Sequence, residues 1–229
     1  MSKRPYVLLS VAMSVDGYID DTSPDRLLLS NAEDFDRVDE VRAGCDAILI
    51  GANTIRRDNP RLLVNSEQRR EDRVRRGLPA YPTKVTITSS SLDCTCKFFN
   101  TGGDKLVYTT PTALGKVRDE LDGLADIIPA GDPVSFPVML DDLGSRGIRR
   151  LMVEGGGMIH TQFLTQGLVD EIHLAVAPFF VGELDAPRFV HPGTFPQDSA
   201  RRMKVAEVRQ IGDIVLVRYL PRNRLTQVS

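Results

Sequence analysis

In the stretch Leu151-Met152-Val153-Glu154-Gly155-Gly156-Gly157-Met158-Ile159-His160, three glycines directly follow an apolar run. The run has the composition of a buried strand, and the residues after the glycines can continue as a helix. Because glycine has no Cβ, backbone N–H groups in such a turn can approach a ligand closely, and the following helix adds partial positive charge. The stretch therefore favours a pyrophosphate at the turn. A tight strand-to-helix turn with nothing bound is the alternative, because the spacing differs from the G-x-G-x-x-G of the ordinary dinucleotide fold.

Short apolar runs alternate with stretches of helical periodicity along the rest of the chain. Strands are expected at Tyr6–Met13, Asp46–Ile50, Lys84–Thr88, Lys105–Thr109, Ala125–Ile128, Arg149–Val153 and Asp170–Phe180. Helices are expected at Pro111–Leu121, Val138–Ser145 and Met158–Gln166, and from a cap at Ser30 or Asn31 to Gly44, with Phe35, Val38 and Val41 on one face. Met203–Gln210 and Ile214–Leu220 have the pattern of a hairpin. This order predicts one α/β domain over residues 1–229, with a mostly parallel sheet flanked by helices and a C-terminal antiparallel hairpin.

Composition excludes several classes of protein. At 229 residues, 41% of them apolar, the chain can bury one large core, and its net charge of −2 gives no basic surface for nucleic acid. The apolar run after Arg4 is too short for a signal peptide or a membrane span, which predicts a cytoplasmic protein that does not bind membranes. Cys45, Cys94 and Cys96 lack the second ligand pair of a structural zinc site, so no metal is expected.

A second polar cluster follows the expected strand Asp46–Ile50. Gly51-Ala52-Asn53-Thr54 comes first, and Asp58 stands directly before Asn59-Pro60. Because a residue before proline favours an extended conformation, Asn59 should form a fixed turn that holds Asp58 rigidly. Glu154 likewise ends a strand, and open α/β sheets bind ligands at the carboxyl ends of their strands. Both carboxylates are therefore candidate site residues, with a solvated or salt-bridged glutamate as the alternative for Glu154.

Ser89-Ser90-Ser91 follows the expected strand Lys84–Thr88. Its hydroxyl and N–H groups would suit an adenosine phosphate at the carboxyl end of that strand. A serine-rich surface turn is the alternative interpretation.

Four ordered motifs together resemble the pyrimidine reductases of riboflavin biosynthesis, a family of the dihydrofolate-reductase-like superfamily. They are Ala12-Met13-Ser14-Val15-Asp16-Gly17, Ile50-Gly51-Ala52-Asn53-Thr54, Asp58-Asn59-Pro60 and Glu154-Gly155-Gly156-Gly157. The likeness spans roughly residues 5 to 182 and includes Gly167-Leu168-Val169-Asp170-Glu171 and Ala177-Pro178. Four motifs at compatible spacing are far more specific than any one alone, and the resemblance implies a dihydrofolate-reductase-like fold.

The resemblance also implies an activity and a site. The expected enzyme uses NADPH to reduce the ribosylamino side chain of a phosphorylated pyrimidine, either 5-amino-6-(5-phosphoribosylamino)uracil or its 2,5-diamino pyrimidinone analogue, by hydride delivery to C1′ of the opened sugar. The implied cofactor positions are Ala12, Leu28, Thr54, Asp58, Ser89, Gly155, Gly156, Gly157, Met158, Ile159 and His160. The implied substrate positions are Arg26, Arg42, Leu62 and Glu154. We expect Asp58 to orient the sugar and assist proton transfer and Glu154 to bind substrate, with the division of roles left open.

The chain departs from the family pattern at two positions. Asn65 stands where an arginine usually holds the substrate phosphate, and Arg26 stands where a serine commonly contacts the substrate. Guanidinium forks suit phosphate, so a replacement could come from the downstream arginines Arg69, Arg70, Arg73, Arg75 and Arg76. The interleaved acidic residues Glu67, Glu71 and Asp72 favour a solvated charged helix or loop instead.

Two other functions remain open. One is a pterin or folate reductase, because Asp34 and Phe35 faintly resemble the acid and aromatic positions of dihydrofolate reductases. The tryptophan that usually precedes that acid is missing. A nucleotide-binding module that has lost its chemistry is the other alternative, and the intact Thr54, Asp58 and Glu154 argue against it.

The C-terminal hairpin predicts a self-association surface. Its strands carry four valines: Val205, Val208, Val215 and Val217. Together with the family resemblance, they lead us to expect a homodimer. The alternative is that these valines cover the chain's own core.

Overall fold

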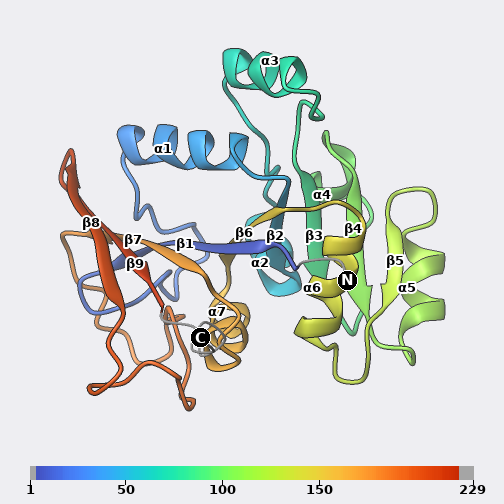
Figure 1. The fold of residues 1–229 in the computed structure, drawn as a ribbon. Coiled ribbons are helices and arrows are strands. Elements are labelled where there is room, and N and C mark those ends of the chain that lie inside the picture. The colour runs from blue at the N-terminus through green and yellow to red at the C-terminus, as the bar shows by residue number, and fades with distance from the viewer. Residues whose placement is uncertain (1–3, 222–229) are drawn as a thin grey trace, which may run out of the picture. The chain divides into compact units, whose positions relative to one another are not determined.

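Strands with short helical connections make up most of the chain in the computed structural model, which describes residues 4–221 (Figure 1). The chain packs as two compact units: the first contains residues 4–5 and 38–152, and the second contains residues 6–37 and 153–221. The helix α1 (Ala32–Ala43) and the strand β6 (Arg150–Gly155) each begin in one unit and end in the other. Over residues 4–221, no helix is long and apolar enough to cross a bilayer.

The first unit is built on parallel strands in the order β5-β4-β3-β2. Their bounds are Ala47–Gly51 for β2, Thr83–Ile87 for β3, Lys105–Thr109 for β4 and Asp126–Pro129 for β5. The helices are α2 (Ala52–Asp58), α3 (Glu67–Arg75), α4 (Lys97–Asn100), α5 (Leu114–Glu120) and α6 (Phe136–Ser145). The strands alternate with short helices, as parallel neighbours require a crossover connection.

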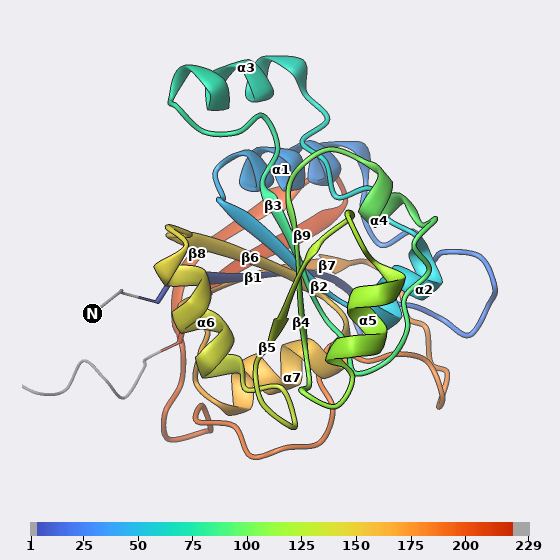
Figure 2. The same cartoon turned by 90° about the vertical axis from the view of Figure 1, so that its right-hand side faces the viewer.

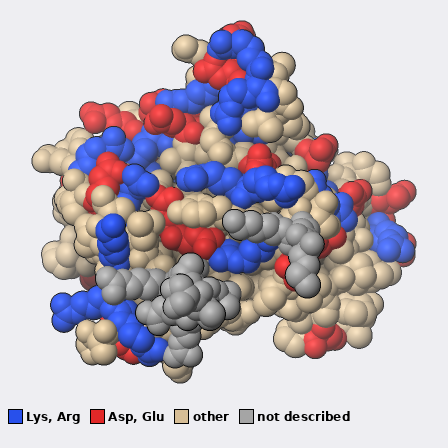
Figure 3. Space-filling model, in the orientation of Figure 1, with Lys and Arg blue, Asp and Glu red and all other residues tan. Residues whose placement is uncertain are grey.

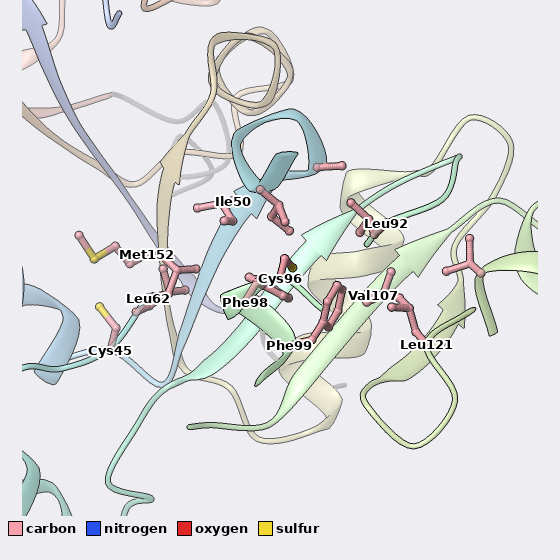
Figure 4. Close-up of a cluster of buried hydrophobic side chains, with 14 residues drawn as sticks. Cys45, Ile50, Leu62, Leu92, Cys96, Phe98, Phe99, Val107, Leu121 and Met152 are labelled. Carbon is pink, nitrogen blue, oxygen red and sulfur yellow. The ribbon is translucent and has the colours of Figure 1, made fainter. Parts of the chain in front are cut away.

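A continuous apolar core lies in this first unit (Figure 4). Phe98 and Phe99 pack edge to face with ring centroids 5.0 Å apart, and Ile50 and Val107 of the sheet belong to the same cluster. Each fully buried side chain of this size contributes about 1.5–3 kcal/mol through its removal from water. Lys84 is also fully buried, and its Nζ donates to the carbonyl and hydroxyl oxygens of Thr101 at 3.1 and 2.6 Å. Burial, together with the charge of Lys105, lowers the pKa of Lys84 to about 7.

The helix α3 lies apart from the strands of its unit (Figure 2). One buried side chain, Arg73, ties it to the rest of that unit: its guanidinium donates to the carbonyl oxygens of Ala43, Cys45 and Pro79 at 2.9, 2.7 and 2.9 Å. Buried charges need such partners, because an unpaired guanidinium in the interior would be strongly destabilising.

The second unit contains β1 (Tyr6–Ser14), β7 (Glu171–Ala177), β8 (Lys204–Ile211), β9 (Ile214–Leu220) and α7 (Gly157–Thr165). The strand β1 pairs in parallel with β7, and β9 pairs antiparallel with both β7 and β8. The predicted fold class is thereby confirmed: the strands are mostly parallel, and the C-terminal hairpin adds an antiparallel edge.

The first helix differs from its prediction in the face that it buries. Asn31 caps α1 as expected, its side-chain oxygen accepting from the backbone N–H of Asp34 at 2.9 Å. Phe35, however, is 42% exposed, whereas Asp34 and Arg37 are buried and paired at 2.7 Å. Arg37 also lies 3.4 Å from Nδ1 of His173, a residue of β7 that is itself buried. The apolar pattern does not reveal this buried polar face, because it depends on the Asp34–Arg37 ion pair and on the contact with His173, which is remote in sequence.

Candidate active site

In the first unit, the short helix α2 carries two of the expected cofactor residues. Thr54 and Asp58 are both half-buried and stand four positions apart, so they share one face of the helix. The helix ends at Asn59, which adopts the left-handed conformation with φ 42° and ψ 54°. The expectation of an extended Asn59 before Pro60 was wrong, because asparagine tolerates this conformation and here caps the helix, donating its N–H to the carbonyl of Ile55.

The turn after Asp58 is nevertheless fixed, as the sequence predicted. The side-chain oxygen of Asn59 accepts from the backbone N–H of Lys97 at 2.6 Å, which links the end of α2 to the start of α4. Asp58 is therefore held by a helix on one side and an anchored turn on the other. Precise placement of this kind is what a group acting on a substrate needs.

The segment after Pro60 contains two further expected substrate positions. Leu62 is 3% exposed and has a φ of 47°, and its side chain belongs to the hydrophobic core. Its side chain is therefore not presented to a ligand. Arg42, in the last turn of α1, donates from Nη1 to the carbonyl of Leu63 at 3.2 Å, so this arginine lies against the same segment.

A buried carboxylate that belongs to no motif, Asp39, holds this segment in place. Asp39 on α1 accepts from the backbone N–H groups of Asn65 and Ser66, the latter at 3.2 Å, and from Nη1 of Arg69 at 3.0 Å. The side chain of Ser66 in turn caps α3. Asp39 thus positions the backbone at Asn65, the position where the resemblance puts a phosphate-binding arginine.

Most of the downstream arginines have partners in the protein. Arg69 pairs with Asp39, and Arg70 donates to the carbonyl oxygens of Val64 and Asn65 at 3.0 and 2.6 Å. Arg73 is buried and connects α3 to the rest of the first unit through its hydrogen bonds. Figure 3 shows acidic and basic side chains interleaved over α3. These contacts favour the interpretation as a charged helix, in which Arg69, Arg70 and Arg73 stabilise structure.

The loop after β3 carries Ser89, which is exposed. Thr88, which is buried, fixes this loop: its hydroxyl donates to the carbonyl of Ser90 at 2.6 Å and accepts from the N–H of the same residue at 3.1 Å. Arg56 of α2 donates to the hydroxyl of Ser90 at 2.8 Å. One arginine thereby connects the two segments of the first unit that carry expected cofactor positions.

In the second unit, the glycine turn joins β6 to α7. Gly155 has a φ of 146°, which favours glycine, and the Gly155–Gly156 peptide bond is cis. A Cβ on Gly157 would lie 2.3 Å from the carbonyl oxygen of Arg188, so only glycine fits there. Within the described residues, no side chain caps the N-terminus of α7 at Gly156. The backbone N–H groups of this first turn therefore suit an anionic ligand.

Two residues at the start of α7 differ in what they can contact. Met158 is exposed, whereas the side chain of His160 is fully buried beneath the turn. Nδ1 of His160 lies 3.2 Å from the carbonyl of Phe189, so this nitrogen carries the hydrogen. Burial lowers the pKa of His160 to about 4, which makes it neutral near pH 7. Ile159 is half-buried. The side chain of His160 supports the turn and does not face solvent.

The remaining expected positions lie in the same unit. Ala12 is half-buried on β1, and Glu154 is half-buried on β6, directly before the glycine turn. Arg26 and Leu28 are exposed, Leu28 by 66%, and the N–H of the intervening Leu27 donates to Asp20 at 3.2 Å. Each unit thus holds its own group of candidate residues: Arg42, Thr54, Asp58, Leu62 and Ser89 in the first, and Ala12, Arg26, Leu28, Glu154 and Gly155 to His160 in the second.

Comparison with known proteins identifies relatives over most of the chain. The RibD C-terminal domain matches residues 5–217. A protein of Archaeoglobus fulgidus named 2,5-diamino-6-ribosylamino-4(3H)-pyrimidinone 5′-phosphate reductase is 34% identical over 92% of this chain and 95% of its own length. A protein of the same name from Methanothermobacter thermautotrophicus is also 34% identical, over 94% of this chain and 98% of its own. In structure, RibD of Acinetobacter baumannii superimposes with a TM-score of 0.77 at 22% identity, covering 95% of this chain and 58% of that chain.

Proposed function

The chain belongs to the RibD C-terminal domain family, and from this membership we propose that it is a cytoplasmic NADPH-dependent reductase of riboflavin biosynthesis. Its substrate would be the 2,5-diamino-6-ribosylamino-pyrimidinone 5′-phosphate. The observation that carries this choice is the 34% identity, over nearly the whole length of both chains, to two proteins named for that substrate. The uracil analogue is the second candidate substrate, as the family resemblance implies, and a relative named riboflavin biosynthesis protein RibD is 28% identical.

We propose that residues 1–229 form one reductase domain that binds NADPH. The uncapped first turn of α7, preceded by Gly155 and Gly156, fits the diphosphate, since its N–H groups and the helix dipole favour negative charge. The other proposed cofactor residues are Ala12, Leu28, Thr54, Asp58 and Ser89.

When bound, the nicotinamide supplies the hydride that reduces C1′ of the opened sugar. The protein's own task is to position C1′ and to handle one proton. Asp58 is fixed at the end of α2 by the turn at Asn59, which suits a group that orients the sugar and assists proton transfer. Glu154, before the glycine turn, would bind the substrate with Arg26, Arg42 and the backbone of Leu62.

An assay of nicotinamide oxidation tests the proposal directly. We expect turnover of the diamino-pyrimidinone phosphate with NADPH and much weaker binding of NADH, because the serines after β3 and Arg56 of α2 suit a 2′-phosphate. Dihydrofolate should not be reduced. Equal affinity for NADPH and NADH would remove the cofactor assignment, and absence of turnover with either pyrimidine would favour a non-catalytic nucleotide-binding module.

The structure removes the reason for the pterin reductase alternative, which was the likeness of Asp34 on the first helix to the acid of dihydrofolate reductases. The carboxylate of Asp34 is fully buried and accepts from Arg37 Nε at 2.7 Å and from the hydroxyl of Ser30 at 2.8 Å. A carboxylate committed to these partners is not presented to a pterin ring.

A homodimer is the second prediction, and we expect its interface on the C-terminal hairpin. Val205, Val208 and Val215 are 53, 65 and 42% exposed. Val208 of β8 lies opposite Val217 of β9, and Val217 lies opposite Leu174 of β7. These three neighbouring strands therefore share an apolar face. Burying it in a second copy would remove these side chains from water. Light scattering at micromolar concentration should give twice the monomer mass, and Val208→Lys should shift the protein towards monomer; a wild-type monomer would refute the dimer.

A further inference from the structure

The short helix α4 contacts the turn that begins at Asp58 and runs over residues 58–62. At the start of α4, the backbone N–H of Lys97 donates to the side-chain oxygen of Asn59 at 2.6 Å. At its end, the hydroxyl of Thr101 donates to the carbonyl oxygens of Lys97 and Arg61, which lie at 2.7 and 3.1 Å. Because α4 contacts this turn at two points, a shift of the helix would move the backbone that carries Asp58.

Lys84 of β3 fixes α4 from the interior of the first unit. A helix of four residues is too short to be stable by itself. The ammonium group of Lys84 donates to the carbonyl oxygens of Phe98 and Thr101 at 3.0 and 3.1 Å, and to the hydroxyl of Thr101 at 2.6 Å. Three N–H groups thus meet three acceptors, the most that an ammonium can satisfy. Figure 4 shows Phe98 of this helix in the apolar core.

The burial of a charged lysine at this place has a cost. Lys84 is 0% exposed, and taking an ammonium out of water is strongly destabilising unless its hydrogen bonds are replaced. An apolar side chain of similar length would avoid that cost, but it would leave the end of α4 without donors for its carbonyl oxygens. What the charge provides is therefore the fixed position of α4.

We propose that Lys84 is a positioning residue for the reaction: it fixes α4, and α4 keeps the turn at Asp58 in the place that turnover requires. The inference rests on the proposed function, in which Asp58 acts on the opened sugar. Lys84 is fully buried, so it acts through α4 and not by touching a ligand. Since displacements of about 1 Å can lower a reaction rate 100-fold, loss of this contact should affect turnover more than binding.

Lys84→Met is the first test, because methionine has a similar length and no N–H groups. We expect kcat with the pyrimidine phosphate to fall about 10- to 100-fold, and the dissociation constant for NADPH, measured by calorimetry, to change less than about twofold. Leu143→Ala is the control for lost stability alone, since Leu143 is fully buried on α6 of the same unit. It should lower the melting temperature and leave kcat unchanged.

The hydroxyl of Thr101 gives a second test, which holds even if Lys84→Met does not fold. Thr101→Val removes the hydroxyl that joins Lys84 to the carbonyl of Arg61, and it should lower kcat about 10-fold or more. Thr101→Ser keeps the hydroxyl and should retain most of the turnover.

Hydrogen exchange monitors the turn without any substrate. The backbone N–H groups of residues 58–62 should exchange about 10-fold or more faster, relative to those of β2, in Lys84→Met and in Thr101→Val. In Leu143→Ala the ratio should stay as in the wild-type protein.

The pH profile is a readout that a merely structural lysine would not change. Burial, and next the charge of Lys105 on β4, lower the pKa of Lys84 to about 7, whereas Cys96 before α4 acts in the opposite direction. A neutral amine has two N–H groups for the three acceptors, and the hydroxyl of Thr101 can then turn towards its nitrogen and away from Arg61. The kcat of the wild-type protein should therefore decline as the pH rises through about 7, and Lys84→Met should lack this decline.

Three results would overturn the proposal: an unchanged kcat in a folded Lys84→Met protein, exchange at residues 58–62 that matches wild type, or the same pH profile in Lys84→Met. An equal loss of turnover in Leu143→Ala would also overturn it, because Lys84 would then act through stability alone. Failure of the proposed function is distinguishable: the wild-type protein would neither bind NADPH nor reduce a pyrimidine, while exchange would still show whether Lys84 fixes the turn.

Discussion

Replacing Asp58 by asparagine is expected to lower the turnover of the pyrimidine substrate about 100-fold or more while leaving NADPH affinity close to wild type. That is the usual scale of general acid–base assistance, which the neutral amide cannot give. The backbone turn at Asn59 and its bond to Lys97 do not involve the Asp58 carboxylate, so the geometry should survive. Steady-state kinetics with saturating NADPH, together with a binding constant for NADPH, provide the measurement. Weaker NADPH binding with unchanged turnover would make Asp58 a cofactor ligand instead.

The position of Asp58 in the helix adds a second readout. Asp58 is the last residue of α2, where a negative charge opposes the helix dipole. The helix dipole alone would therefore favour Asp58→Asn by about 0.3–1 kcal/mol in the free energy of unfolding, which chemical denaturation of the variant and the wild type measures. A loss of activity without a loss of stability separates a chemical role from a structural one.

Glu154→Gln is the matched control. A carboxylate that binds the substrate equally in its ground and transition states contributes uniform binding, so its loss should raise KM with little effect on kcat. If both variants keep full activity, the active site has been assigned to the wrong carboxylates.

The elements with a clear apolar run or helical periodicity were predictable, whereas the short helices α2 and α4 were not. The strand at Lys105–Thr109 has the predicted bounds, because its apolar run ends at clear turn residues. The seven-residue helix α2 has only Ala52 and Ile55 buried, so it offers too little periodicity to recognise. The burial of Asp34 and Arg37 was not predicted for another reason: Arg37 lies against His173 of β7, and this neighbour cannot be inferred from the sequence of the helix alone.

The candidate site residues likewise divide into those that a motif predicts and those that only the fold reveals. Motifs identified Asp58, Glu154 and the glycines, because their types and spacing carry the chemistry. Asp39 and Arg56 belong to no motif, and their roles depend on hydrogen bonds to residues 26 and 34 positions away along the chain. Residues that position a ligand through long-range contacts are visible only once the fold is known.

The glycine turn gives the second large effect: Gly156→Val should weaken NADPH binding about 100-fold or more in a folded protein. Gly156 has φ −92° and ψ −166°, an extended conformation that valine also adopts, so the backbone does not require glycine there. What glycine provides is space at the uncapped start of α7, where a branched side chain would keep the diphosphate from the N–H groups. Calorimetry with NADPH and circular dichroism measure binding and fold in the same preparation.

Gly157→Ala is the contrasting variant, since the glycine beside it has a structural reason to be there. Its added Cβ would lie 2.3 Å from the backbone oxygen of Arg188, so the alanine protein should melt at a lower temperature. The two substitutions thus separate the two interpretations of the glycine run. A Gly156→Val protein that is folded and binds NADPH as well as wild type would mean that this run is only a tight turn between β6 and α7, and that the diphosphate lies elsewhere.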